Sequence, residues 1–275
     1  MYKIRSSFYV KVLQLFLVFI VSTTLINCGG GGSSSNTPTT TTATGYFIDS
    51  PVEGLTYVSG SQSGTTDASG KFTYEVGKTV KFSVGAISLG EVRAKGKMTP
   101  VDLVANADAS NTNVLNISRF LMALDSDGNA TNGITISDAT KTATQSASQI
   151  DFATATDATL TSALTPLTTN TMVSSSTAQT HLTSSIYALY AGTYSGTNSG
   201  TSPSLSGTIR FTIDSNGANV DPFSGQLTTS GATTFAAGSS SQGVSFSGTI
   251  DASTGVASGT YSDHWGGGTW TGTRS

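Results

Sequence analysis

The residues best suited to binding a metal are Asp125, Asp127 and Asn129, which alternate along an Asp-Ser-Asp-Gly-Asn stretch. Side-chain oxygens at alternate positions can turn toward one hard cation, so the pattern predicts a Ca²⁺ site and no other cofactor. The stretch departs from an EF-hand loop, because Ala130 replaces the turn glycine and Ile136 replaces the bidentate glutamate. The alternative interpretation is a turn after a helix, in which the aspartates accept hydrogen bonds from backbone amides.

A second candidate site combines Asp263, His264, Trp265 and Trp270. A carboxylate and an imidazole beside two tryptophans can hydrogen-bond and stack on a sugar, so one interpretation is a binding edge. The other interpretation is a hairpin tip before a last strand, because the intervening residues are mostly glycine. The other histidine of the chain, His181, lies beside the apolar face of a predicted helix and is expected to be structural.

The sequence carries no motif of an activated nucleophile. It contains 42 serines and 46 threonines, but abundance does not activate a hydroxyl. Gly-x-Ser-x-Gly, a Walker-type phosphate loop and His-Glu-x-x-His are all absent from the sequence. We therefore expect no catalysis, and an envelope hydrolase with a dispersed site is the alternative.

The only cysteine, Cys28, follows a segment with the features of an export signal. Residues 1–11 carry three basic side chains, and residues 12–25 form an apolar run of 14 residues. A transmembrane helix needs about 20 such residues, so the run is short for a span. The stretch Leu-Ile-Asn-Cys over residues 25–28 resembles the lipobox of bacterial lipoprotein signal peptides.

This resemblance implies that Cys28 is lipidated and that residues 1–27 are removed as a signal peptide. Several acyl chains, at about 0.8 kcal/mol per buried CH₂, would anchor the protein durably in a membrane. Gly29 after the cysteine implies the outer membrane of a bacterial envelope, and the alternative is an uncleaved single-span anchor. Residues 28–44 are rich in Gly, Ser and Thr, which predicts a flexible tether.

The balance of acidic and basic residues limits the classes of molecule that the protein is expected to bind. Residues 28–275 hold ten Lys and Arg against 16 Asp and Glu, which argues against a nucleic-acid partner. Six of those basic residues fall within residues 71–97, where we expect a solvated face, with binding of an acidic polysaccharide as the alternative. Hydrophobic residues make up 36% of the chain, which argues against wholesale disorder.

Alternation of apolar and polar residues predicts short strands over residues 45–98. Tight turns between these strands favour a small β-sandwich. The apolar positions expected to face the core are Tyr46, Ile48, Leu55, Tyr57, Phe72, Tyr74, Val76, Val80, Phe82 and Val84.

Two stretches of this region, SPVEGLTY at 50–57 and GTTDASGKFTY at 64–74, resemble a module of bacterial surface lipoproteins. The module is similar to the carboxypeptidase-regulatory or prealbumin-like β-sandwich, which implies a structural stalk domain. In its turn we expect Asp67 to accept backbone hydrogen bonds, Gly70 to adopt positive φ and Phe72 to return to the core.

Residues 99–191 change to helical spacing. Asn111 or Thr112 is the expected N-cap of a first helix. Asp157 is expected to begin a short helix that ends before Pro166. Ser176 and Gln179 resemble a capping box at the start of the last helix.

Residues 192–275 return to strand patterns and hold 16 of the 31 glycines. About seven or eight short strands would form an antiparallel meander, closed as a barrel or folded as a sandwich. The predicted fold is thus mainly β, with a sandwich, a helical middle segment and this C-terminal β-domain.

The sequence favours a membrane-anchored envelope lipoprotein with a structural or adhesive role and a glycan or protein partner. A small-ligand carrier is the alternative if the C-terminal strands enclose a cavity.

Overall fold

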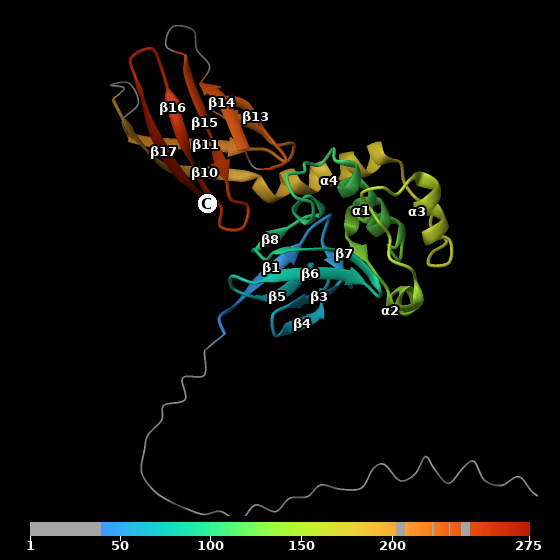
Figure 1. Cartoon of the computed structure of the whole chain (residues 1–275). Helices are drawn as coiled ribbons and strands as arrows, with labels where there is room; N and C mark the ends of the chain where they lie inside the picture. Colours follow the sequence, from blue (N-terminus) through green and yellow to red (C-terminus); the bar gives the residue numbers. More distant parts are fainter. Residues whose placement is uncertain (1–39, 202–206, 222, 231, 238–242) are drawn as a thin grey trace, which may run out of the picture. The chain divides into compact units, whose positions relative to one another are not determined.

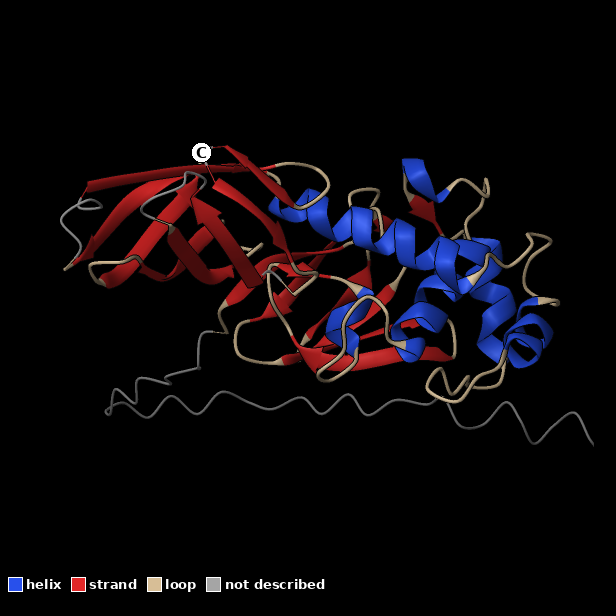
Figure 2. Ribbon diagram, turned by 90° about the horizontal axis from the view of Figure 1, so that it is seen from above, coloured by secondary structure: helices blue, strands red, loops and turns tan. Residues whose placement is uncertain are grey.

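The computed structural model describes residues 40–201, 207–221, 223–230, 232–237 and 243–275 (Figure 1). Strands occupy both ends of this range and helices the middle, which confirms the predicted fold class (Figures 1 and 2). Residues 1–27, the predicted signal peptide, and Cys28 lie outside the described residues. In the part of the chain that is described, no helix is both long and apolar enough to cross a bilayer.

The N-terminal strands form small sheets packed as a β-sandwich. One sheet has the order β5-β1-β8 and the other the order β4-β3-β6-β7. The ring of Phe82 meets those of Phe47 and Phe72 between the sheets, at centroid distances of 4.8 and 5.0 Å. The strands are β1 (Thr42–Phe47), β2 (Val52–Glu53), β3 (Thr56–Ser59), β4 (Gln62–Thr65), β5 (Lys71–Glu75), β6 (Thr79–Val84), β7 (Ile87–Arg93) and β8 (Lys97–Met98).

The predicted side-chain register of β1 is wrong by one residue. Phe47 and Asp49 are fully buried, whereas Tyr46 and Ile48 are only half-buried. The reason is that the Phe47 ring fills the space between the sheets, while the Tyr46 ring lies under the ammonium group of Lys97 at 3.9 Å. The predicted inward positions of β6 are correct.

The turn before β5 has the predicted construction. Oδ1 of Asp67 accepts hydrogen bonds from the backbone N–H of Ser69 at 2.9 Å and of Lys71 at 3.1 Å. Gly70 has a φ of 74°, and Phe72 is buried in the sandwich core. The turn thus returns the chain to the core over a few residues.

Four α-helices and three short 3-10 helices lie in the middle segment of the described chain (Figure 1). Asn111 caps α1, as predicted, because its side chain accepts hydrogen bonds from the first-turn amides. The predicted capping box of α4 is wrong: Ser174, with an extended backbone, is the N-cap, and Ser176 already lies within the first turn. The elements are η1 (Pro100–Leu103), α1 (Thr112–Ala123), η2 (Ala130–Asn132), β9 (Ile134–Thr135), α2 (Asp138–Ala143), η3 (Thr144–Ser146), α3 (Asp157–Leu164) and α4 (Ser175–Tyr190).

The middle segment shares its hydrophobic cores with the β-structure on both sides. Ile117 and Phe120 of α1 pack in the sandwich core. Val114 of the same helix packs with Leu182 and Ile186 of α4 in the second core, which includes the C-terminal strands. Residues 40–275 accordingly form one compact unit.

The C-terminal strands form a closed antiparallel barrel in which each strand pairs with the next. Pairing of β10 with β17 completes the ring. The meander was predicted, and of the two predicted closures the barrel is the one observed. The strands are β10 (Gly192–Gly200), β11 (Gly207–Ile213), β12 (Ala218–Asp221), β13 (Phe223–Leu227), β14 (Ala232–Ala237), β15 (Val244–Ile250), β16 (Val256–Ser262) and β17 (Gly267–Arg274).

Replacement of Gly70 by alanine should destabilise the fold by at least about 2 kcal/mol. The residue has positive φ, and a β-carbon there would lie 2.3 Å from the carbonyl oxygen of Phe47. The free energy of unfolding in urea measures the effect.

Gly77→Ala is the matched control, because Gly77 has a φ of 85° but nothing within 4 Å of a β-carbon. It should cost only the backbone strain, about 1 kcal/mol. Equal losses for the two variants would show that the close approach to Phe47 has no energetic effect.

Candidate functional site

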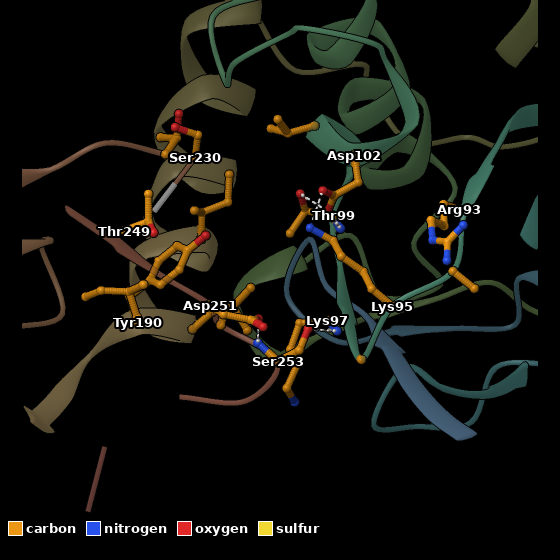
Figure 3. Close-up of a pocket in the computed structure, with 18 of the residues that line it drawn as sticks. Arg93, Lys95, Lys97, Thr99, Asp102, Tyr190, Ser230, Thr249, Asp251 and Ser253 are labelled. Atoms are coloured by element: carbon orange, nitrogen blue, oxygen red, sulfur yellow. Dashed lines mark hydrogen bonds and ion pairs between the residues drawn. The ribbon is translucent and has the colours of Figure 1, made fainter. Parts of the chain in front are cut away.

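A groove of about 830 Å³ lies where the sandwich, the end of α4 and the barrel come together (Figure 3). The sandwich contributes the end of β7 and the residues after it, and the barrel contributes the end of β15 and the turn after it. The backbone N–H of Lys97 donates to Oγ of Ser253 at 2.8 Å and joins the two sides. The polar lining residues labelled in Figure 3 are Arg93, Lys95, Lys97, Thr99, Asp102, Tyr190, Ser230, Thr249, Asp251 and Ser253.

Basic side chains line the sandwich side of this groove. Arg93, Lys95 and Lys97 alternate along the chain and all belong to the lining, but the Lys97 ammonium group lies over the Tyr46 ring, which is not part of it. Nζ of Lys95 lies 2.7 Å from Oδ1 of Asp102, yet the Lys95 side chain remains 53% exposed. Arg93 and Lys95 are exposed, as expected for a solvated face. Their place in a groove was not predicted, although the alternate spacing of the three residues is visible in the sequence.

The opposite side of the groove supplies an aromatic ring and hydroxyl groups. Burial, followed by the carboxylates of Asp102 and Asp251, raises the pKa of Tyr190 to about 12. The phenol therefore keeps its proton at neutral pH and is available as a hydrogen-bond donor. The groove thus combines basic side chains, the carboxylates of Asp102 and Asp251 and neutral hydroxyl groups, a lining that can hydrogen-bond a polyhydroxylated ligand.

The loop that contains Asp125 follows α1 directly. Asp125 is only 2% exposed, and its Oδ1 accepts the backbone N–H of Thr135 at 2.8 Å. Oδ1 of Asp127 accepts the N–H of Asn129 at 2.9 Å, and Oδ1 of Asn129 accepts the hydroxyl of Thr131 at 2.6 Å. The structure thus brings the three predicted residues together in one turn. Across the described ranges, no three His, Cys, Asp or Glu side chains gather as a metal site.

The second predicted site is the tight turn that connects the barrel strands β16 and β17. Oδ1 of Asp263 accepts the backbone N–H groups of Trp265 and Gly266, each at 2.9 Å. The His264 and Trp265 rings meet edge to face at a centroid distance of 5.5 Å, and Trp265 is 50% exposed. The hairpin tip and an exposed aromatic edge are therefore both present.

Trp270 does not belong to this edge, which corrects the predicted set. It is 1% exposed and lies inside the barrel. Its indole N–H donates to the carbonyl oxygens of Ser247 and Thr260 at 3.2 and 3.1 Å. Trp270 lies within β17, where it alternates with the exposed Thr269 and Thr271 and faces the barrel interior, whereas Trp265 lies in the turn before that strand.

Aromatic rings occupy the barrel interior. Tyr194 stacks on Phe211 at 4.9 Å between centroids, and Phe211 meets Trp270 edge to face at 5.6 Å. All three side chains are at most 1% exposed. The inner space between these strands is therefore filled by the protein itself.

A buried polar cluster that the sequence did not reveal joins the sandwich to both long helices. The hydroxyl of Ser118 in α1 donates to Oδ2 of Asp49 at 2.6 Å. Nε2 of His181 in α4 lies 3.1 Å from the Asp49 carbonyl oxygen and 3.5 Å from its Oδ1. Asp49 and Ser118 are both fully buried, so this polar cluster connects the sandwich to α1 and α4 inside the protein.

No protein-family model matches the chain, and no curated protein sequence or solved structure matches it significantly. The candidate site is therefore interpreted from its geometry and chemistry. The lipobox and the relationship of the sandwich to a lipoprotein module stay predictions from the sequence.

Asp49→Asn should remove a pH dependence from the stability of the protein. Burial raises the pKa of Asp49 above its ordinary value of 3.8, against the opposing effects of His181 and Ser118. Between these two pKa values the folded state holds the proton that the unfolded state has lost, so the free energy of unfolding falls as pH rises. The slope approaches about 1.4 kcal/mol per pH unit and is measured by urea unfolding from about pH 4 upward.

Asp151→Asn is the control for this prediction. Hydrogen bonds, first that from Thr154, lower the pKa of Asp151, so its own contribution to stability is lost only as pH falls below 3.8. This variant should keep the parental slope at higher pH. An unchanged slope in Asp49→Asn would mean that Asp49 ionises in the folded state as it does in the unfolded state.

Proposed function

We propose that this chain is a non-catalytic binding protein of the bacterial cell envelope, held at the outer membrane by a lipid on Cys28. The sandwich would serve as the stalk and as one side of the binding groove. The expected ligand is a glycan with negative charge, and no nucleic acid is expected. The groove between the sandwich and the barrel is the observation that carries the binding role.

Support for the anchor comes from the sequence. A basic segment, a short apolar run and a single cysteine follow each other in the order used by lipoprotein signal peptides. Lipidation accounts for a lone cysteine in an exported protein, where it has no partner for an intrachain disulfide. The first strand begins at Thr42, which leaves a short polar segment between the anchor and the folded part.

Support for glycan binding comes from the groove lining. Arg93 offers positive charge beside the Lys95–Asp102 ion pair, and Tyr190 offers a ring edge and a protonated hydroxyl. Guanidinium and ammonium groups pair with carboxylates, and hydroxyls pair with sugar hydroxyls. An acidic polysaccharide meets both requirements in one ligand.

The alternative functions have less support. A carrier needs an enclosed cavity, whereas Tyr194, Phe211 and Trp270 occupy the interior beside β10, β11 and β17. A hydrolase needs an accessible nucleophile beside a base, whereas the Ser118 hydroxyl is buried and donates to Asp49. Neither histidine lines the groove.

Mass spectrometry of the membrane-extracted protein tests the anchor. The N-terminal peptide should begin at Cys28 and carry a lipid mass, because the lipobox directs cleavage before the modified cysteine. Cys28→Ser should lack the lipid and keep residues 1–27.

A Ser33→Ala variant in the neighbouring tether should be lipidated like the parent. Two results would contradict the proposed lipid anchor. One is an intact Met1 terminus in the parent, and the other is a Cys28→Ser form that is still cleaved and found in the same membrane fraction.

Retention on polygalacturonate-coated beads, compared with neutral dextran-coated beads, tests the groove. The double variant Arg93→Gln/Lys95→Gln should bind polygalacturonate about five- to thirtyfold more weakly, because two exposed charge contacts are lost. Retention of the parent should fall as salt rises.

Lys71→Gln/Lys81→Gln removes the same charge from exposed positions of the same sandwich outside the groove lining. It should bind like the parent. Equal losses in both double variants would indicate a diffuse charge effect, and no retention of the parent would reject the acidic glycan as the ligand.

A further inference from the structure

We propose that the loop after α1 binds one Ca²⁺ through the carboxylates of Asp125 and Asp127. This inference is independent of the lipid anchor and of the groove. It rests on an oxygen atom of Asp125 that the turn interpretation leaves unexplained.

The Asp125 side chain has one satisfied and one unsatisfied oxygen. Oδ1 accepts the N–H of Thr135, whereas Oδ2 is buried and has no hydrogen-bond donor. A buried acceptor without a partner is unfavourable, and such groups are rare in folded proteins. The Thr135 bond uses only Oδ1, and the nearby N–H of Asn129 is already capped by Asp127, so the turn leaves Oδ2 of Asp125 without a role.

The Asp125 carboxyl group is enclosed by the fold, with only 2% of the residue exposed. Asp127 and Asn129 lie in the same turn, where Oδ1 of Asp127 accepts the N–H of Asn129 and its Oδ2 accepts from Nδ2 of Asn132 at 2.9 Å. A cation bound in this turn would supply the partner that Oδ2 of Asp125 lacks.

The surrounding structure adds negative potential and holds the loop in place. The loop follows the C-terminal end of α1, where carbonyl dipoles favour a cation. Nδ2 of Asn170 donates to the carbonyl oxygens of Ala123 and Asp125 at 3.1 and 2.6 Å. The N–H of Ser126 donates to the Thr135 carbonyl oxygen at 2.9 Å, so β9 braces the other side.

The chemistry of the donors selects Ca²⁺ among common cations. The loop offers oxygen atoms only, which disfavours Zn²⁺. An irregular loop with waters in the remaining positions suits the variable coordination of Ca²⁺ better than the strict octahedron of Mg²⁺. With two carboxylates, the expected Kd is in the range of extracellular calcium modules, about 10⁻⁴ to 10⁻³ M.

Calorimetric titration of the full chain with CaCl₂, in detergent and near neutral pH, tests the proposal. One Ca²⁺ should bind per chain, and Tm should rise by about 3–6 °C at ten times Kd relative to chelator. Asp127→Asn, an exposed position, should weaken binding about tenfold or more while melting like the parent in chelator.

Asp125→Asn separates loss of a ligand from loss of the fold. Its Oδ1 can still accept from Thr135, and its new N–H can donate toward Asp127, so stability in chelator should be equal or higher. Its calcium response should be absent. The exposed Asp151→Asn removes an equal charge and should bind Ca²⁺ like the parent.

Three results would overturn the proposal. The first is the absence of saturable Ca²⁺ binding in the parent. The second is an equal response to Mg²⁺ at the same concentration. The third is a parental calcium response in both Asp125→Asn and Asp127→Asn.

Discussion

Helix α1 packs into two hydrophobic cores at once, and the rest of the described structure depends on that burial. Ile117 and Phe120 face the sandwich core, whereas Val114 faces the core that α4 shares with the barrel. Removal of apolar surface from water is the main favourable term in folding, so one helix links the stabilities of both β-structures. The groove is formed by parts of the chain that this helix keeps together.

Local patterns predicted local structure well. The Asp67–Gly70 turn and the α3 helix were recognisable because every requirement lies within a few residues: a capping side chain, a glycine at positive φ or a proline after the helix. The barrel strands were recognisable as a meander for the same reason. Their closure was one of two open alternatives, because pairing of β10 with β17 depends on residues far apart in sequence.

The features that sequence could not predict depend on distant partners. Tyr46, Phe47 and Ile48 are all apolar, so alternation alone could not decide which of them faces the core. Asp49 looks like an ordinary turn residue, and only the fold brings Ser118 and His181 to it. The groove likewise combines three separate segments of the chain.

The barrel draws its first and last strands into direct contact. Hydrogen bonds between β10 and β17 close the ring, so β10 has no partner on that side until Gly267–Arg274 has been synthesised. Such closure requires contacts of high sequence separation and is slow compared with the formation of a helix. A chain cut before β17 would expose two unpaired strand edges, each a template for joining to another molecule. Nascent and truncated forms of this protein are thus the ones that need protection against aggregation.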